Sequence, residues 1–350
     1  MKRLFLLNLA FFALFVASGQ VEADTSDFSY DESQMANNIY NEAIDLVDEG
    51  KYSEAIAKLN KALELKPGFA KAIYNRGCIR LHLNNPDGAM EDFNNVLQLS
   101  PSSKVYYSRA LARMKKEEFN EAIEDFTIAI LEDKDYAEAY YYRGTIHYDQ
   151  GEYGKALEDF TSAIKARPDY AYAYNDRGSA YLKFDEFDKA EMDYEKATIL
   201  DPSLAFAFSN LGYVHELQDK KKEAVEDYTA ALKVDPDYFL AFNDRGKVKH
   251  ELGDFEGALE DYNTALKISP EYVYALNNRG NTKFMLGDFE GAIADYTEAI
   301  TLNPRYGEAY LNRGICKEMR RDDEGACRDW NKAMSFGMKE AEEYLNEKCK

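Results

Sequence analysis

The sequence predicts an all-α protein of stacked helix pairs, because one pattern recurs about every 34 residues. Every copy has alanine at its twentieth place and a large apolar side chain at its twenty-fourth, and most have glycine at the eighth. Nine copies are expected, at residues 36–69, 70–102, 103–136, 137–170, 171–204, 205–238, 239–272, 273–306 and 307–338.

Each copy is expected to form two helices, since apolar or small residues at places 4, 8, 11, 17, 20, 24 and 27 follow helical spacing. Small residues at places 8 and 20 let the two helices approach closely, and the ring at place 24 fills the space beside them. Proline at place 32 ends the second helix, because it lacks an amide donor. One copy cannot bury its apolar face alone, so the copies should stack into one elongated core.

With Gly144 at place 8, Ala156 at place 20, Phe160 at place 24 and Pro168 at place 32, the fourth copy resembles the tetratricopeptide repeat (TPR) family. The resemblance covers about 300 of the 350 residues. It implies a helix-turn-helix solenoid, coiled as a right-handed superhelix, whose first helices line a concave groove. Residues 339–350 are expected to form a capping helix. The motif specifies the fold and says little about function.

The N-terminus predicts export. Residues 1–23 have two positive charges, a short apolar run and then small residues, which is the layout of a secretory signal peptide. Cleavage after Gly19 or after Ala23 would fit, and a retained anchor is the alternative. The acidic segment 24–35 lacks periodicity and is expected to be a mobile leader. The protein should therefore be periplasmic or secreted.

Composition argues against several classes of function. A formal net charge of −21 disfavours nucleic-acid binding, which needs clustered Lys and Arg. The four histidines, His82, His147, His215 and His250, lack metal-ligand spacing and are expected in the groove or on the surface. No nucleophile, phosphate-loop or zinc-protease motif is present, so we expect no enzyme, cofactor, metal or small-molecule substrate.

Polar residues dominate place 6, on the first helix of each copy. We call this set the amide ladder: Asn41, Asn75, Ser108, Tyr142, Asp176, Asn210, Asp244, Asn278 and Asn312. The position resembles the asparagine ladder that holds peptide main chains in the O-GlcNAc transferase family. A carboxamide can donate to and accept from a peptide bond. The alternative is that these side chains bond neighbouring repeats or water.

Place 7 is arginine in seven copies and place 23 is aspartate in eight, a set that we call the charge ladder. In the first copy the signs are exchanged, with Glu42 at place 7 and Lys58 at place 23. This exchange predicts ion pairs inside each copy that fix the register of the two helices. In the sixth copy Leu211 leaves Asp227 without this partner.

The groove is expected to bind extended peptides through amides and aromatic rings, although stacking on sugars is an alternative. Place 5 changes from Tyr in the first four copies to Asn or Ser in the next four. We expect the site in copies 4 to 8. The predicted groove residues are Asn75, Asp176, Asn210, Asp244, Asn278, Asn312, Tyr141, Tyr172, Phe206 and Tyr274.

Of the four cysteines, Cys78 should remain free, whereas the other three cluster near the C-terminus. In an exported protein we expect a Cys327–Cys349 disulfide that ties the cap to the last repeat, with Cys316 as an alternative partner. The sequence as a whole predicts a non-catalytic protein- or peptide-binding scaffold. The alternative function is a structural subunit of an envelope assembly that uses an acidic convex face.

Overall fold

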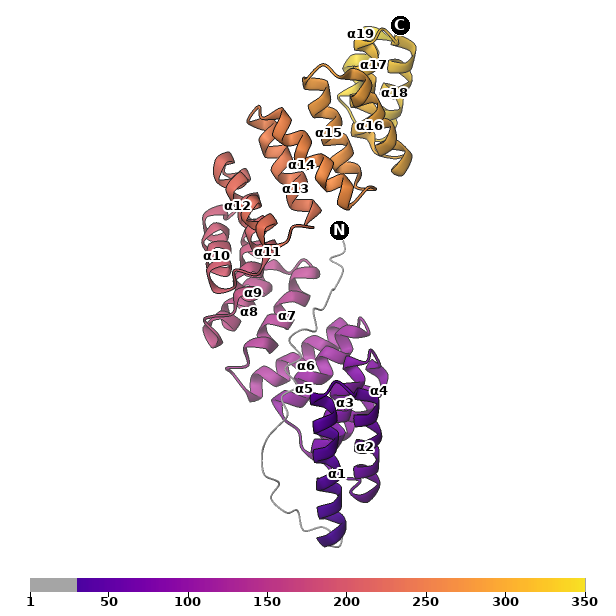
Figure 1. The fold of residues 1–350 in the computed structure, drawn as a ribbon. Coiled ribbons are helices and arrows are strands. Elements are labelled where there is room, and N and C mark those ends of the chain that lie inside the picture. Colours follow the sequence, from indigo (N-terminus) through magenta and orange to yellow (C-terminus); the bar gives the residue numbers. More distant parts are fainter. Residues whose placement is uncertain (1–29, 350) are drawn as a thin grey trace. The chain divides into compact units, whose positions relative to one another are not determined.

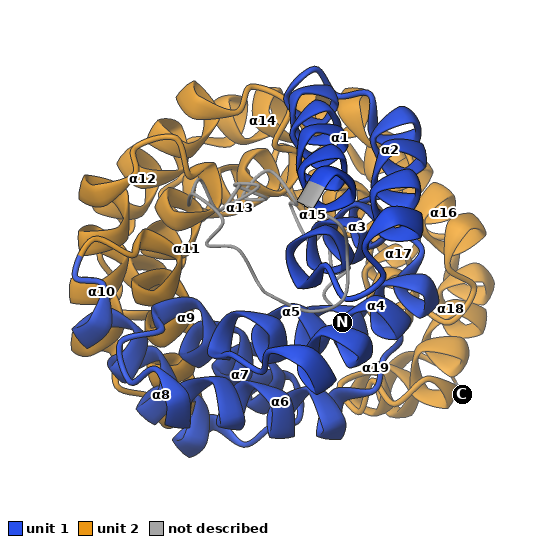
Figure 2. Ribbon diagram, turned by 90° about the horizontal axis from the view of Figure 1, so that it is seen from below, with its two compact units in different colours: residues 1–168 blue, residues 169–350 orange. Residues whose placement is uncertain are grey.

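The computed structural model describes residues 30–349, which form α-helices and a 3-10 turn without strands (Figure 1). They divide into two compact units, with unit 1 ending at Pro168 and unit 2 beginning at Asp169 (Figure 2). The predicted signal peptide lies outside the described residues.

Unit 1 consists of four helix pairs: α1 (Tyr30–Asp48) and α2 (Tyr52–Leu65), α3 (Ala70–His82) and α4 (Pro86–Leu99), α5 (Ser103–Lys115) and α6 (Phe119–Glu132), α7 (Ala137–Asp149) and α8 (Tyr153–Ala166). Unit 2 contains α9 (Ala171–Tyr181), η2 (Leu182–Phe184), α10 (Phe187–Leu200), α11 (Ala205–Leu217), α12 (Lys221–Val234), α13 (Phe239–Glu251), α14 (Phe255–Ile268), α15 (Val273–Met285), α16 (Phe289–Leu302), α17 (Gly307–Met319), α18 (Asp323–Ser335) and α19 (Ala341–Lys348). Within each unit, consecutive helices pack as antiparallel pairs.

The first helix corrects one expectation. Helix α1 begins at Tyr30, so the last residues of the expected mobile leader 24–35 are helical. Asp31 and Glu32 lie in its first turn, where a negative charge is stabilised by the positive end of the helix dipole. The acidic composition that suggested disorder is therefore also suitable for a helix N-terminus.

Glycine at place 8 and the ring at place 24 set the distance between paired helices. A Cβ atom added at Gly280 would lie 2.6 Å from Cε1 of Tyr296, and one added at Gly144 would lie 2.9 Å from Cε1 of Phe160. Both rings are almost completely buried. In these two repeats the close approach of the paired helices thus leaves no room for a side chain at place 8.

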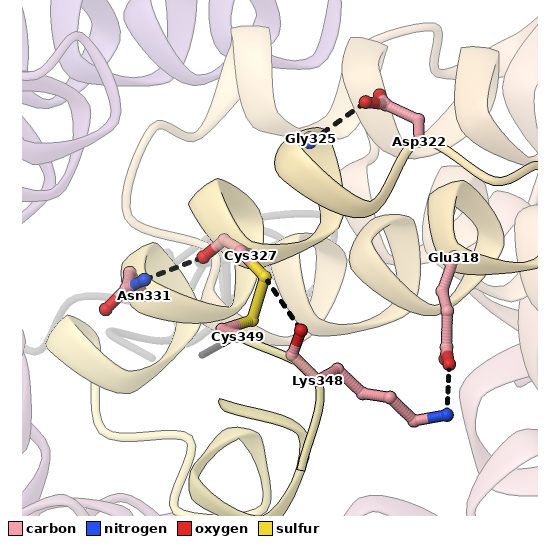
Figure 3. Close-up of a disulfide and its surroundings, with 7 residues drawn as sticks. All are labelled: Glu318, Asp322, Gly325, Cys327, Asn331, Lys348 and Cys349. Atoms are coloured by element: carbon pink, nitrogen blue, oxygen red, sulfur yellow. Dashed lines mark hydrogen bonds and ion pairs between the residues drawn. A yellow bond between two sulfur atoms is a disulfide. The ribbon is translucent and has the colours of Figure 1, made fainter. Parts of the chain in front are cut away.

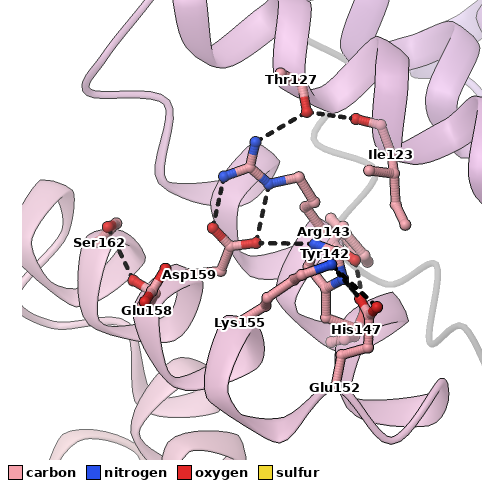
Figure 4. A network of polar contacts seen from close by, with 11 residues as sticks. Ile123, Thr127, Tyr142, Arg143, His147, Glu152, Lys155, Glu158, Asp159 and Ser162 are labelled. Atoms are coloured by element: carbon pink, nitrogen blue, oxygen red, sulfur yellow. Dashed lines mark hydrogen bonds and ion pairs between the residues drawn. The ribbon is translucent and has the colours of Figure 1, made fainter.

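The charge ladder forms within the helix pairs. Arg143 donates two hydrogen bonds to Asp159, 2.6 and 2.9 Å long, and a third to Thr127 of the preceding pair (Figure 4). The same paired geometry joins Arg76 to Asp92, Arg109 to Asp125, Arg177 to Asp193, Arg245 to Asp261, Arg279 to Asp295 and Arg313 to Asp329. Lys58 pairs with Glu42 in reversed sense. The predicted pairing within a copy is therefore present in every repeat except the sixth, where Leu211 stands at place 7.

A second cation, at place 11, reaches most of the same aspartates. Arg80 lies 2.9 Å from Asp92, and Lys249 lies 2.8 Å from Asp261. Arg113, Lys283 and Lys317 occupy equivalent positions in their repeats. Since these aspartates are at least nine-tenths buried, two cations compensate for the loss of hydration of one carboxylate.

Repeat 6 replaces the missing arginine with histidine. His215 Nδ1 lies 2.6 Å from Asp227 Oδ2, and its Nε2 lies 3.1 Å from Glu191 Oε1 of the preceding repeat. His147, at the same place in repeat 4, is also buried and contacts Glu152 (Figure 4). The expectation that these two histidines lie in the groove or on the surface was wrong, because both are buried beside carboxylates of the helix pairs.

The C-terminal helix α19 packs against the last repeat. Tyr344 stacks on the buried ring of Trp330, with ring centroids 4.9 Å apart. Cys327 and Cys349 form a disulfide with their Cα atoms 5.7 Å apart (Figure 3). Cys78 and Cys316 are buried free thiols. The disulfide and the aromatic stack together hold the cap on unit 2.

The substitution Gly280→Ala is expected to lower the stability of α15 and α16 by about 1–3 kcal/mol, because the new methyl group must displace the Tyr296 ring. Urea unfolding and hydrogen exchange of these helices would measure the loss. Gly154→Ala is the control, since nothing lies within 4 Å of the added Cβ atom. Equal stability of the two variants would contradict this account of place 8.

Removing a buried member of the charge ladder is expected to destabilise its helix pair. Arg245→Ala leaves Asp261 with Lys249 alone and should cost roughly 3 kcal/mol, because the carboxylate stays buried. Hydrogen exchange of α13 and α14 would report this loss. Glu42→Ala removes the equivalent residue from an exposed ion pair. The amide hydrogens of α1 and α2 should therefore exchange in this variant as they do in the wild type. Equal effects of the two substitutions would refute a dependence on burial.

Candidate functional site

The candidate site is the face formed by places 2, 5, 6, 9 and 12 of the first helices, which we call the first-helix face. In unit 2, helices α11, α13 and α15 lie on the inner side of the curved stack, and α12, α14 and α16 lie on its outer side (Figure 2). The first helices of successive pairs also contact one another. Side chains at places 5 and 6 of adjacent repeats are thereby brought together.

In unit 1 the amide ladder bonds tyrosines of the preceding repeat. Asn75, which is buried, donates to the Tyr40 hydroxyl over 2.8 Å. The Ser108 and Tyr74 hydroxyls lie 2.8 Å apart. Place 6 of one repeat therefore meets place 5 of the repeat before it.

Unit 2 has the same connection with carboxamides on both sides. Asn210 donates to Asn175 Oδ1 over 2.8 Å, and Asn278 donates to Asn243 Oδ1 over 3.0 Å. Asn312 donates to Asn277 and Asn281, over 3.2 and 3.0 Å. Of the two alternatives for the amide ladder, bonding between repeats accounts for Asn75, Asn210, Asn278 and Asn312. A role in peptide binding is not needed to explain them.

The two aspartates of the amide ladder differ from its asparagines. Asp176 and Asp244 each accept a hydrogen bond from the asparagine that precedes them in sequence, and both bonds are 3.0 Å long. Burial raises the pKa of Asp244 to about 6, and the nearby Glu216 carboxylate adds to this, whereas the Asn243 amide opposes it. Asp244 is thus a carboxylate whose charge is incompletely compensated.

The predicted aromatic residues fall into three groups. Tyr141 of unit 1 packs against Tyr142 and Phe160, with centroids 5.2 and 5.9 Å away. Tyr172 and Phe206 of unit 2 contact each other at 5.8 Å. Tyr274 belongs to a further cluster, in contact with Tyr272 at 5.5 Å and Tyr306 at 5.6 Å. Tyr274 is 51% exposed, so much of its ring is available for contact.

The first-helix face of unit 1 has a concavity of about 150 Å³. Tyr40, Tyr74, Asn75, Lys71 and Lys104 line it together with residues of the neighbouring turns. The Lys104 ammonium lies 5.0 Å from the centre of the Tyr74 ring. Both lysines stand at place 2, the place that Tyr172, Phe206 and Tyr274 occupy in their repeats. A larger concavity, about 320 Å³, lies at the turn Asp185–Lys189 and involves none of the predicted residues.

Two further findings concern the described part of the chain. Residues 30–349 contain no group of three or more His, Cys, Asp or Glu side chains arranged to hold a metal ion. Within the same range no helix combines the length and the apolar character that crossing a membrane requires.

The helix pairs, their small-residue contacts and the first-helix face define a helical repeat scaffold of the kind that mediates protein–protein interaction. Profiles described as "TPR repeat" or "Tetratricopeptide repeat" match residues 45–84, 70–103, 107–160, 143–205, 205–238, 246–287 and 273–306. The chain belongs to the tetratricopeptide repeat family.

Similar proteins match only parts of the chain. The TPR repeat-containing thioredoxin TDX of Arabidopsis thaliana is 31% identical over 112 residues, which are 32% of this chain and 29% of that protein. Peptidyl-prolyl cis-trans isomerase FKBP4 of Mus musculus is 41% identical over 75 residues, 19% of this chain and 16% of that protein. The chain thus covers less than a third of the length of these relatives.

Among solved structures, a tetratricopeptide repeat protein from Parabacteroides merdae aligns with 71% of this chain and 99% of its own, with a TM-score of 0.55. Its sequence identity is 22%. The likeness therefore shows a shared fold.

Acidification from pH 7 to pH 5 is expected to stabilise unit 2 more in the wild type than in Asp244→Asn. The folded pKa of Asp244, about 6, exceeds the ordinary value of 3.8, so the folded state binds more protons between these values. Stability therefore rises as pH falls through 6. Asparagine does not titrate. Asp227, whose pKa burial also raises to about 6, is common to both proteins and cancels.

Thermal unfolding of both proteins, followed by circular dichroism between pH 5 and pH 8, would test this difference. Parallel profiles would contradict it, as would a steeper profile for the asparagine variant.

Proposed function

We propose that this protein is a non-catalytic scaffold that acts outside the cytoplasm and binds a protein or peptide on its first-helix face. The concavity of unit 1, lined by tyrosines, an amide and lysines of that face, is the observation that carries the proposal. Rings offer contact area at low conformational cost, and the ammonium groups of Lys71 and Lys104 can donate to peptide carbonyl groups. Because the first helices of adjacent repeats present these groups side by side, an extended peptide is the favoured ligand.

Unit 2 supports the same function through exposed aromatic residues. Tyr213 and Tyr274 stand on first helices and are 46% and 51% exposed, whereas the rings at place 24 are almost completely buried. Action outside the cytoplasm is supported by the predicted signal peptide and by the Cys327–Cys349 disulfide, since disulfides persist in oxidising compartments.

The test is capture of partners from the exported fraction by the tagged protein and by Tyr213→Ala/Tyr274→Ala. These tyrosines are preferable to Asn210 and Asn278, which hold adjacent repeats together. The control, Met192→Ala/Ile199→Ala, removes two exposed apolar side chains from α10, a second helix. Circular dichroism would verify equal folding of the three proteins.

A partner lost only with the tyrosine variant would place binding on the first-helix face, because only that variant removes its rings. A partner retained by the tyrosine variant and lost by the control would favour the alternative, a structural subunit that uses the outer, second-helix side.

A further inference from the structure

An asparagine–aspartate pair recurs on the first-helix face of unit 2 at an interval of two repeats. Asn175–Asp176 and Asn243–Asp244 occupy places 5 and 6 of repeats 5 and 7. In both repeats the asparagine accepts a bond from the next repeat and donates one to its aspartate. Each carboxylate thus ends a chain of oriented amide groups, because every donor in it points toward the aspartate.

Asp244 does not perform the structural task of the asparagines around it. Asn210 and Asn278 each donate to the preceding repeat, whereas an ionised carboxylate has no proton to donate. The place 5 residue before it, Ser209, instead bonds the hydroxyl of Tyr238. Asparagine at position 244 would serve the packing of repeats at least as well, so the carboxylate calls for another explanation.

No cation among residues 30–349 forms an ion pair with Asp244. Lys247, less than one helical turn further on, pairs with Glu216 of the preceding repeat. The first-helix face near Asp244 therefore has two carboxylates, Asp244 and Glu216, and one ammonium group. The aspartates of the charge ladder are different, because arginine or histidine contacts each of them.

Three tyrosines lie within electrostatic range of the Asp244 carboxylate. Burial raises the pKa of Tyr228, Tyr238 and Tyr272. The negative charge of Asp244 also raises the pKa of all three hydroxyls. Tyr272 is also in ring contact with Phe239 at 5.0 Å and with the exposed Tyr274 at 5.5 Å. A half-buried carboxylate that has no ion pair within residues 30–349 offers charge-assisted hydrogen bonding to a cation of a bound peptide.

We propose that Asp244 binds the lysine or arginine side chain of an extended peptide on the first-helix face of unit 2, which also carries the exposed Tyr274 in ring contact with Tyr272. This inference rests on the proposed function and names the chemistry of the partner, a basic segment. The formal net charge of −21 favours the approach of such a partner. Unit 1 differs, because two lysines line its concavity, so we assign the basic segment to unit 2.

The test uses the full-length protein and three fluorescein-labelled nonapeptide pools with mixed tyrosine, serine and alanine flanks. The central residue is lysine, norleucine, which has a similar aliphatic chain without the ammonium group, or glutamate. Binding is followed by fluorescence anisotropy at pH 7.5 and low salt. Asp244→Asn keeps the acceptor oxygen for Asn243 and removes the charge. The control, Glu260→Gln, removes one exposed carboxylate from the second helix α14.

We expect the wild type to prefer the lysine pool over the norleucine pool, and Asp244→Asn to weaken lysine binding about tenfold while norleucine binding changes less than about twofold. Glu260→Gln should change lysine binding less than about twofold, because an exposed, distant charge is screened.

Three outcomes would overturn the inference. They are equal binding of lysine and norleucine pools, an unchanged preference in Asp244→Asn, or an equal loss in Glu260→Gln. Peptide binding with no preference for lysine would leave the proposed function intact. Failure of the wild type to bind any pool would reject the basic segment, and the capture experiment with Tyr213→Ala/Tyr274→Ala would then decide the proposed function separately.

Discussion

The aspartate at place 23 is the constraint on which each helix pair depends. It is at least nine-tenths buried in repeats 2–5 and 7–9, and a buried carboxylate is costly unless cations and hydrogen bonds replace its water. Arginine at place 7 approaches it with two nitrogens, which fixes the orientation of both helices. The third nitrogen group of that arginine bonds the preceding repeat in most cases, as Arg143 does with Thr127. One side chain thereby sets the register within a repeat and the contact with its neighbour.

Repeats 5 and 6 depart from this arrangement in complementary ways. Repeat 5 keeps Arg177 but has Tyr181 where most repeats have a second cation, and repeat 6 has Leu211 in place of arginine and relies on His215. Glu191 of repeat 5 also contacts His215 and binds Lys220. Inside these two repeats fewer cations contact the aspartate at place 23 than in most others. Contacts of Glu191 with His215 and Lys220 join the two repeats across their boundary instead.

The first-helix faces of the two units are built in the same way but carry different side chains. Place 5 bonds place 6 of the next repeat in both, through tyrosine hydroxyls in unit 1 and carboxamides in unit 2. These hydrogen bonds between repeats already occupy the polar groups of the amide ladder. Side chains that take no part in them are therefore the better candidates for ligand contact. They include the lysines of the unit 1 concavity and, in unit 2, the exposed Tyr213 and Tyr274 and the carboxylate of Asp244.

The sequence by itself determined the helix pairs, because small residues at places 8 and 20 and a large apolar side chain at place 24 recur with helical spacing in every copy. It also determined the charge ladder, since Glu42 and Lys58 exchange signs together. Only the tertiary structure decided that the asparagines bond adjacent repeats and that His147 and His215 are buried, because these contacts join side chains about 35 or 12 residues apart in ways that depend on helix packing. The recurrence of Arg, Lys or His at place 11 was visible in the sequence. Its meaning required the distance to the aspartate, which one-dimensional spacing does not supply.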